Sequence, residues 1–399
     1  MPEIRTIKAQ IGTNQEGTSA HNKRVIIEAL RLNGALSRAD LARATRLTKQ
    51  TISNLVETLE LQGLVTSEEV VRQGRGQPST PYRLVPDGAF AIGVQIDRHL
   101  TRAVAVDLVG TALVKAQAPL PRGGPEHGVP VILGLISQVR ADLAQLRPEA
   151  EDRLTGLGVA MPGPFGLHPA DQDPWMMAAW QTFPLLDTLA QETGLDVAMQ
   201  NDAAACATAE RMLGKAHGLD DAVCLYLGYG IGAGLILGGE LYRGGHGNAG
   251  ELGMVLIGGK DLRSPLEHRA SLASLYSQVG LDPADPDVNL HTLALLDAGD
   301  PALDHWITEA AQDLKWAVHL IETLLDPQTV IISGGAPEAL AKRLVAEIEP
   351  LLPSNAQRQD RSLPRLTLGM FDPWAVALGA AVEPISRAFD PRFAAILKE

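Results

Sequence analysis

Four polar side chains with the chemistry to read DNA fall on one side of a short predicted helix. Lys49, Gln50, Ser53 and Asn54 lie in its first two turns, and its other side is apolar. The amides of Gln and Asn can pair with adenine through two hydrogen bonds, and Lys can reach guanine or a phosphate. A recognition helix presents such side chains to base edges from its first turns. The pattern favours DNA reading over the alternative, a protein-interaction domain with a solvated polar face.

Three helical patterns in close succession would position this helix. The first is expected to follow a polar arm, to be capped at Asn22 and to end at Gly34. The second begins at Ser37, and Asp40 stands three residues on, as in a capping box. Thr48 caps the third helix, whose apolar side comprises Ile52, Leu55, Val56 and Leu59. Two short helices, a tight turn and a third helix predict a helix-turn-helix.

A basic, glycine-rich tip follows the third helix. Residues 64–65 and 70–71 are interpreted as a strand, residues 72–78 as the tip, and residues 82–84 as the returning strand. A tip that carries arginines suits insertion into a minor groove, so a winged helix is predicted. The predicted DNA contacts are Ser37, Arg38, Thr48, Lys49, Gln50, Thr51, Ser53, Asn54, Arg72, Arg75 and Gln77.

The charge of the chain also differs between the predicted winged helix and the rest of the sequence. The 399 residues are 45% apolar and 20% charged, an ordinary globular composition, with a net charge of −13. Residues 1–86 carry a net charge of +4, and the remainder carries −17. A basic head on an acidic body suggests a nucleic-acid-binding module attached to a part with another task. The two cysteines, Cys206 and Cys224, are too few for a disulfide framework or a four-cysteine metal site.

One uncharged stretch has the minimum length of a membrane span. Residues 222–239 carry no charge, but they include six glycines, each of which costs a helix about 1 kcal/mol. A glycine-bent pair of strands in a core is therefore expected. The N-terminus, at residues 1–5, has no apolar segment of a signal peptide. These observations predict a soluble, cytoplasmic protein with no membrane partner.

The body of the chain alternates strands and helices in two similar halves, which predicts an α/β fold of two lobes with a cleft between them. A hairpin is expected at residues 91–107 and a loop at residues 119–130, before a helix at residues 131–146. The glycines at 228, 230, 232 and 234 do not form a dinucleotide fingerprint, because the third glycine of G-x-G-x-x-G falls on Ala233 or Leu235. No Walker A motif is present either.

Six ordered motifs resemble those of the ROK family (repressors, open reading frames and kinases), in its regulator branch with an N-terminal winged helix. The resemblance covers residues from about 20 to 385. It implies an actin-like ATPase fold for the body and a sugar site in the cleft. The matching runs are residues 37–42 (SRADLA), 158–164 (GVAMPGP), 201–203 (NDA), 227–235 (LGYGIGAGL), 247–253 (GNAGELG) and 331–335 (IISGG).

The resemblance also identifies a turn that departs from the family's kinases. Those enzymes carry Asp-x-Gly-Gly-Thr between the first two strands of the body, where backbone amides and the Thr receive the ATP phosphates. Here the turn is Asp97-Arg98-His99-Leu100-Thr101. Both glycines are replaced by larger side chains, so the backbone cannot approach phosphates closely. We expect no ATP binding and no catalytic residues.

The same resemblance assigns four candidate sugar contacts. Asp202 matches the family's catalytic base, Asn201 and Glu251 match its sugar contacts, and Glu267 matches the Glu that follows its zinc cysteines. Carboxylates and amides suit sugar hydroxyls, which both donate and accept hydrogen bonds. The structural alternatives are that Asn201 and Asp202 cap the next helix and that Glu251 pairs with a nearby cation.

The family's structural zinc site is missing from the sequence. Its His corresponds to Met254, and the three cysteines expected before Leu266–Glu267 are absent from a shortened segment. We therefore predict no zinc. Because that His also contacts sugar in relatives, its loss leaves the identity of the effector open.

The expected domains are a flexible arm at 1–20, the winged helix at 21–86, a first ROK lobe at 87–200 completed by residues 375–399, and a second lobe at 201–374. The partners expected are operator DNA, a small sugar or sugar derivative, and a second copy in a homodimer, or a tetramer built from two dimers. The favoured function is a sugar-responsive regulator, most readily a repressor of carbohydrate metabolism. The alternatives are a sugar kinase fused to a winged helix, and a regulator that needs no effector.

Overall fold

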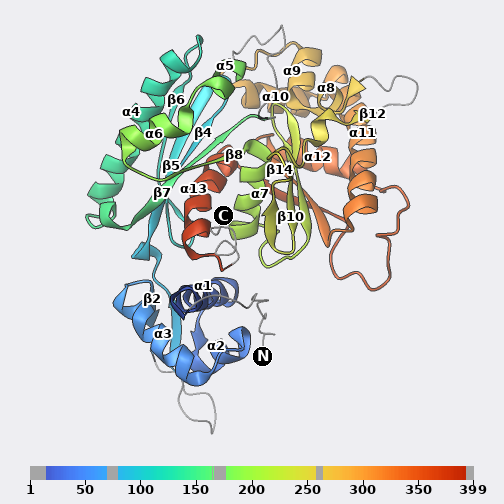
Figure 1. Cartoon of the computed structure of the whole chain (residues 1–399). Helices are drawn as coiled ribbons and strands as arrows, with labels where there is room; N and C mark the ends of the chain where they lie inside the picture. Colours follow the sequence, from blue (N-terminus) through green and yellow to red (C-terminus); the bar gives the residue numbers. More distant parts are fainter. Residues whose placement is uncertain (1–14, 70–79, 164, 166–176, 258–263, 392–399) are drawn as a thin grey trace.

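The computed structural model describes residues 15–69, 80–163, 165, 177–257 and 264–391. A small N-terminal domain lies at one end of a larger two-lobed body (Figure 1). The body has one five-stranded sheet in each lobe. The described part thus has the predicted α/β architecture, with a winged helix before a two-lobed body.

The N-terminal domain is a three-helix unit with a small sheet. Its elements are α1 (Gln15–Asn33), β1 (Leu36–Ser37), α2 (Arg38–Thr45), α3 (Lys49–Leu61), β2 (Val65–Ser67) and β3 (Pro81–Leu84). The strands pair antiparallel in the order β1-β3-β2. Ile26, Leu41, Ile52 and Leu59 are buried together in its core. The apolar side predicted for the third helix therefore holds this domain together.

The start of the first helix differs from the prediction. Helix α1 begins at Gln15, so Asn22 lies inside the helix and does not cap it. Apart from Gly17, the residues between them do not strongly disfavour a helix, and the polar composition alone did not mark a helix end. The predicted end holds, because Gly34 has φ of +72°, the left-handed conformation that glycine adopts readily.

The sheet of the first lobe has the order β6-β5-β4-β7-β8. Its strands are β4 (Phe90–Ile96), β5 (Leu100–Asp107), β6 (Ala112–Pro119), β7 (Leu154–Met161) and β8 (Val197–Asn201). A 3-10 turn (Pro86–Gly88) leads into β4, a second one (Glu151–Arg153) leads into β7, and the helices are α4 (Pro125–Leu146), α5 (Met177–Thr182) and α6 (Leu185–Thr193). The expected hairpin is β4 paired with β5.

Helix α4 begins earlier than expected, and its apolar composition bears on the prediction that the chain has no membrane partner. It begins at Pro125, so half of the loop expected at 119–130 is helix; Pro at the first helical position is compatible with this start. By length and composition α4 is the one described helix that could cross a bilayer. Ile132, Ile136 and Val139 on this helix are, however, fully or almost fully buried in the core of the first lobe. Its apolar character is accounted for by that packing.

The sheet of the second lobe has the order β11-β10-β9-β14-β15. Its strands are β9 (Ala222–Leu227), β10 (Ile231–Leu237), β11 (Glu240–Tyr242), β14 (Thr329–Gly334) and β15 (Leu366–Phe371); β12 (Leu256–Ile257) and β13 (Ser264–Pro265) pair separately. The helices are α7 (Asp202–Leu213), α8 (Glu267–Ala270), α9 (Leu272–Val279), α10 (Val288–Ala298), α11 (Pro301–Leu325) and α12 (Glu338–Ile348), with a 3-10 turn at Leu252–Met254. The glycine-rich stretch is the antiparallel pair β9–β10, as predicted.

Helix α13 (Ala375–Phe389) joins the parts of the molecule (Figure 1). It packs against α7 and against β4 and β7, and it also contacts α1 of the N-terminal domain. Leu378, Val382 and Ile385 belong to the same buried cluster as Ile26 and Leu30 of α1. The core of the N-terminal domain is therefore continuous with one side of the body.

Candidate functional site

The polar side of α3 is presented to solvent as predicted. Lys49, Gln50 and Asn54 are exposed, and Gln50 Nε2 donates a hydrogen bond to Asn54 Oδ1 over 2.9 Å. Ser53 is half-buried on the same helix. The exposed amides are thus held next to each other at the start of the helix, where a recognition helix contacts bases.

Side-chain caps fix the two helices of this unit. Ser37 and Asp40 form the predicted capping box at the start of α2, and Thr48 Oγ1 accepts a hydrogen bond from the Thr51 amide at the start of α3. Ser37 is buried, so its observed task is capping rather than surface contact. The Arg38 guanidinium lies 5.2 Å from the centre of the Tyr82 ring, which docks α2 on β3. Arg72, Arg75 and Gln77 lie outside the described residues.

In the body, the four predicted sugar contacts gather where the two lobes meet. Asn201 Nδ2 donates to Glu251 Oε1 over 3.2 Å, and Asn201 Oδ1 caps α7 by accepting from the Ala204 amide over 2.8 Å. Glu267 accepts a hydrogen bond from the Ile231 amide over 3.1 Å. Both the capping role of Asn201 and its contact with Glu251 are therefore realised. The cation pairing considered for Glu251 is not among the described ion pairs.

The electrostatics of this cluster centre on Asp202. Its side chain is buried, and its Oδ1 has no hydrogen-bond partner within the described residues. Burial raises the pKa of Asp202 to about 8, and the nearby Asp97 and Glu251 carboxylates act in the same direction, against Arg98. Burial also raises the pKa of Glu251. A neutral Asp202 can donate a hydrogen bond as well as accept one.

The turn between β4 and β5 is filled by side chains. Asp97 Oδ1 accepts a hydrogen bond from the Arg98 amide over 2.7 Å, and the Arg98 guanidinium lies 4.6 Å from the centre of the Tyr229 ring. The His99 ring lies edge-on to the same tyrosine ring, with 6.3 Å between the two ring centres. Thr101 is fully buried, and its hydroxyl donates to the Gln95 carbonyl over 2.9 Å. The hydroxyl that would face a phosphate is therefore engaged with the backbone.

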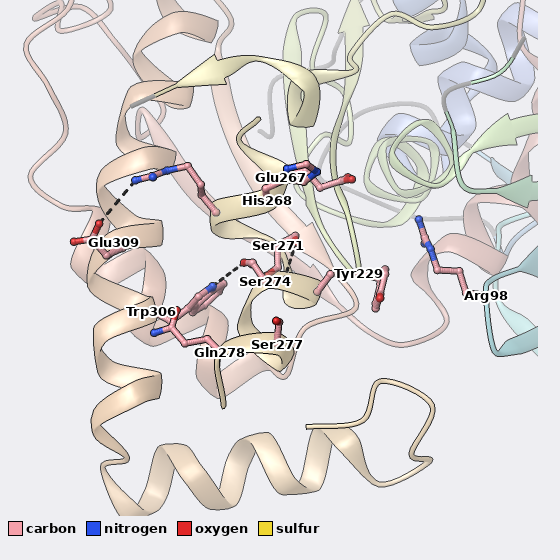
Figure 2. Close-up of a pocket in the computed structure, with 12 residues that line it drawn as sticks. Arg98, Tyr229, Glu267, His268, Ser271, Ser274, Ser277, Gln278, Trp306 and Glu309 are labelled. Carbon is pink, nitrogen blue, oxygen red and sulfur yellow. Dashed lines mark hydrogen bonds and ion pairs between the residues drawn. The ribbon is translucent and has the colours of Figure 1, made fainter. Parts of the chain in front are cut away.

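Two cavities flank Tyr229. One, of about 570 Å³, lies between Arg98 on one side and α8, α9 and α11 on the other; Glu267 and Trp306 line it (Figure 2). The second, of about 310 Å³, lies between the β4–β5 hairpin, the start of α10 and the start of α13. Glu267 is the one predicted sugar contact that lines either of these cavities in the described part of the chain.

The described residues do not fit the family's zinc site. Met254 stands in place of the His and its side chain is exposed, with a thioether that is a poor zinc ligand. Among the described residues, no three His, Cys, Asp or Glu side chains come together as a metal site would require. Residues 258–263, within the shortened segment, lie outside the description, so the absence of zinc remains a prediction.

Several residues near the cavities were not predicted from the sequence. In the sequence, Tyr229 lies within a glycine-rich turn that carries no signal of a binding role, although it lines both cavities. Arg102 on β5 and Trp374 at the start of α13 come together with 5.8 Å between the guanidinium carbon and the ring centre. Trp374 is far from Arg102 in the sequence, so only the fold could reveal the pair.

Comparisons with known proteins agree with this architecture. Residues 91–382 match the ROK family model, and residues 24–76 match the MarR family model. An uncharacterized protein, y4fQ, from Sinorhizobium fredii is 27% identical over 92% of this chain and 91% of its own length. The xylose repressor of Bacillus subtilis is 26% identical over 59% of this chain and 60% of its own length. A beta-glucoside kinase from Listeria innocua is 32% identical over 59% of this chain and 82% of its own length.

Two solved structures extend the comparison. A ROK family transcriptional regulator described as a homologue of the E. coli MLC protein superposes over 95% of this chain and 98% of its own, with a TM-score of 0.67 and 22% identity. The ROK hexokinase of Thermus thermophilus superposes over 73% of this chain and 97% of its own, with a TM-score of 0.55 and 26% identity. The family model covers most of the chain and the fold agrees with it. The chain therefore belongs to the ROK family.

Proposed function

We propose that this chain is a DNA-binding transcriptional repressor whose kinase-like body binds a sugar or sugar derivative without phosphorylating it. The observation that carries the proposal is the exposed, amide-bearing start of α3, in a winged helix that shares one chain with a ROK body. A sugar kinase needs no such helix. Relatives that are named xylose repressors support the link to carbohydrate control.

The sugar-binding part of the proposal rests on the cluster at the lobe junction. Asn201, Asp202 and Glu251 lie together there, and Glu267 lines the adjacent cavity of about 570 Å³. A cavity of this size suits a small ligand. The neutral Asp202 carboxyl and the Glu267 carboxylate offer the mixed donors and acceptors that sugar hydroxyls need.

The absence of kinase activity rests on the β4–β5 turn. His99 and Leu100 put side chains where the kinases of the family have glycines, and the Thr101 hydroxyl is already bonded to the Gln95 carbonyl. Backbone amides therefore cannot enclose a phosphate chain as they do in phosphate-binding loops. Sugar-dependent ATP consumption, measured in a coupled assay with a panel of monosaccharides, would overturn this part and favour a kinase fused to a winged helix.

A repressor of this type acts in the cytoplasm as a symmetric dimer. One α3 helix contacts one half-site, and two half-sites lie about one helical turn apart, at about 34–36 Å. A two-fold dimer places two copies of α3 at that spacing. Pairing of two dimers into a tetramer would allow two operators to be held at once.

The experiment that tests the DNA-binding part compares two exposed glutamines, one in the first turn of α3 and one directly after its last residue. We expect Gln50→Ala to weaken specific binding to the intergenic DNA beside the protein's own gene by about tenfold, because a bidentate base contact contributes 1–3 kcal/mol. Gln62→Ala, at the exposed opposite end of α3, is the matched control and should leave affinity unchanged. Fluorescence anisotropy with labelled duplex measures both.

An equal effect of the two changes, or no effect of either, would contradict the assignment of α3 as the recognition helix. Binding that stays specific but shows no response to any sugar would instead favour a regulator that needs no effector.

A further inference from the structure

The cavity of about 310 Å³ is not used by the function proposed above. It lies at the junction of three parts: the β4–β5 hairpin with β6, the turn and helix that begin at Pro283, and the start of α13. Tyr226, Tyr229 and Tyr276 contribute aromatic walls. Tyrosine side chains combine a large apolar ring surface with a polar hydroxyl group. The cavity thus offers packing for a ring-shaped ligand.

The charges that line this cavity do not match a polyphosphate. Three carboxylates, Asp97, Asp285 and Asp372, line it together with one arginine, Arg102. Outside the lining, Arg98 lies 3.5 Å from Asp97, and His291 Nδ1 lies 3.3 Å from Asp285. The phosphates of a polyphosphate would add negative charge beside these carboxylates, and like charges repel in a partly desolvated site. A neutral ligand with many hydroxyl groups avoids that cost, and it can donate hydrogen bonds to the carboxylates.

The hydrogen-bonding side chains of this wall are available to a ligand. Gln117 and Asn289 have no side-chain hydrogen bond within the described residues. Arg102 makes one long bond, 3.3 Å from its Nη1 to Gln95 Oε1, and no described ion pair. The guanidinium carbon of Arg102 lies 5.8 Å from the centre of the Trp374 ring. Two amides and a guanidinium can therefore bind hydroxyl or ring oxygens without first breaking strong contacts.

Tyr229 lines both this cavity and the larger one. Arg98 stacks on its ring from the side of the larger cavity, and His99, which lines the smaller cavity, meets its edge. Figure 2 shows Tyr229 between Arg98 and the wall that carries Glu267. A ligand that passes the tyrosine would meet polar groups on both sides and a ring surface in the middle.

We infer that the effector is a disaccharide or glycoside, with one sugar unit beside Glu267 and the second in the cavity formed by Arg102, Gln117 and Asn289. This inference rests on the proposed function, because it names the class of sugar that the repressor senses. According to this inference, the side of the cleft next to the β4–β5 turn, where the kinases of the family bind phosphates, recognises the second sugar unit.

Calorimetric titration with matched pairs of sugars tests the inference. The probes are glucose with cellobiose and xylose with xylobiose, in each case the monosaccharide with its β1-4 disaccharide. We expect one disaccharide to bind at least about tenfold more tightly than its monosaccharide, the gain from one or two further hydrogen bonds and a stacked ring. The double variant Gln117→Ala/Asn289→Ala should remove this gain and leave monosaccharide affinity unchanged.

Asn355→Ala, an exposed asparagine of the second lobe, is the matched control and should preserve the gain. Equal affinities within every pair, or a gain that survives the double variant, would overturn the inference. If monosaccharides alone release the protein from DNA, the proposed function stands and only this inference fails. If no saccharide binds, the sensing part of the proposed function fails as well.

Discussion

At the scale of single residues, the electrostatics of the cluster at the lobe junction centre on one buried carboxyl group, that of Asp202. Asn201, Asp202, Glu251 and Glu267 were predicted from motifs, and the fold brings them to the junction of the two lobes. The raised pKa of Asp202 depends on burial and on Asp97, which is separated from it by more than a hundred residues. Such a shift arises only when the fold removes the group from water.

The buried Asp202 predicts how stability changes with pH. Between the ordinary pKa of aspartate and pH 8, the folded protein keeps a proton that the unfolded chain has released. The contribution of this group to stability therefore falls as the pH rises through that range. We expect Asp202→Asn, which cannot ionise, to gain stability relative to the unmodified protein between pH 5 and pH 8, by at least about 1.4 kcal/mol, the equivalent of one pKa unit.

Urea denaturation at the two pH values measures this difference. Asp297→Asn, which removes an exposed carboxylate on α10, supplies the comparison for a change at the surface. A difference between Asp202→Asn and the unmodified protein that stays constant from pH 5 to pH 8 would show that Asp202 is ionised in the folded state.

At the scale of elements, α13 connects the cleft to the DNA-reading domain. Val376, at its first turn, lines the smaller cavity, and Trp374 just before it lies against Arg102. Farther along, Leu378 and Val382 share a buried cluster with Ile26 of α1. A ligand that shifts the start of α13 would therefore act on the packing of α1, which is a contiguous physical connection between the two sites.

The tight packing of this helix depends on glycine. A Cβ at Gly379 would collide with the Ala205 carbonyl of α7, whereas a Cβ at Gly134, in the exposed part of α4, meets nothing within 4 Å. We expect Gly379→Ala to destabilise the protein by about 1–3 kcal/mol, because the backbone of α7 cannot move away cheaply. The matched change Gly134→Ala should stabilise it by about 0.5–1 kcal/mol through helix propensity.

Thermal or urea unfolding of the two variants gives the comparison. Equal effects of the two changes would mean that α13 and α7 can separate without cost, and the helix would then be too loosely packed to transmit a signal.

At the scale of the whole molecule, the order of domains was more predictable than the contacts between them. The helix caps at Ser37 and Thr48 and the glycine-rich turn after Leu227 are local signals, and the structure has the predicted elements there. The start of α1 was missed because the residues before Asn22 carry no strong stop signal. The cluster shared by α1 and α13 joins residues more than 350 positions apart, which no local pattern encodes.

The central claim is that a sugar bound in the cleft lowers affinity for DNA. Fluorescence anisotropy on the intergenic fragment, at several salt concentrations and with and without a saccharide panel, tests it most directly. We predict specific binding with a steep salt dependence, weakened by one saccharide in the unmodified protein and unaffected by it in Asp202→Ala, which keeps its DNA affinity. DNA affinity that no saccharide changes, or a saccharide response that survives in Asp202→Ala, would contradict the account.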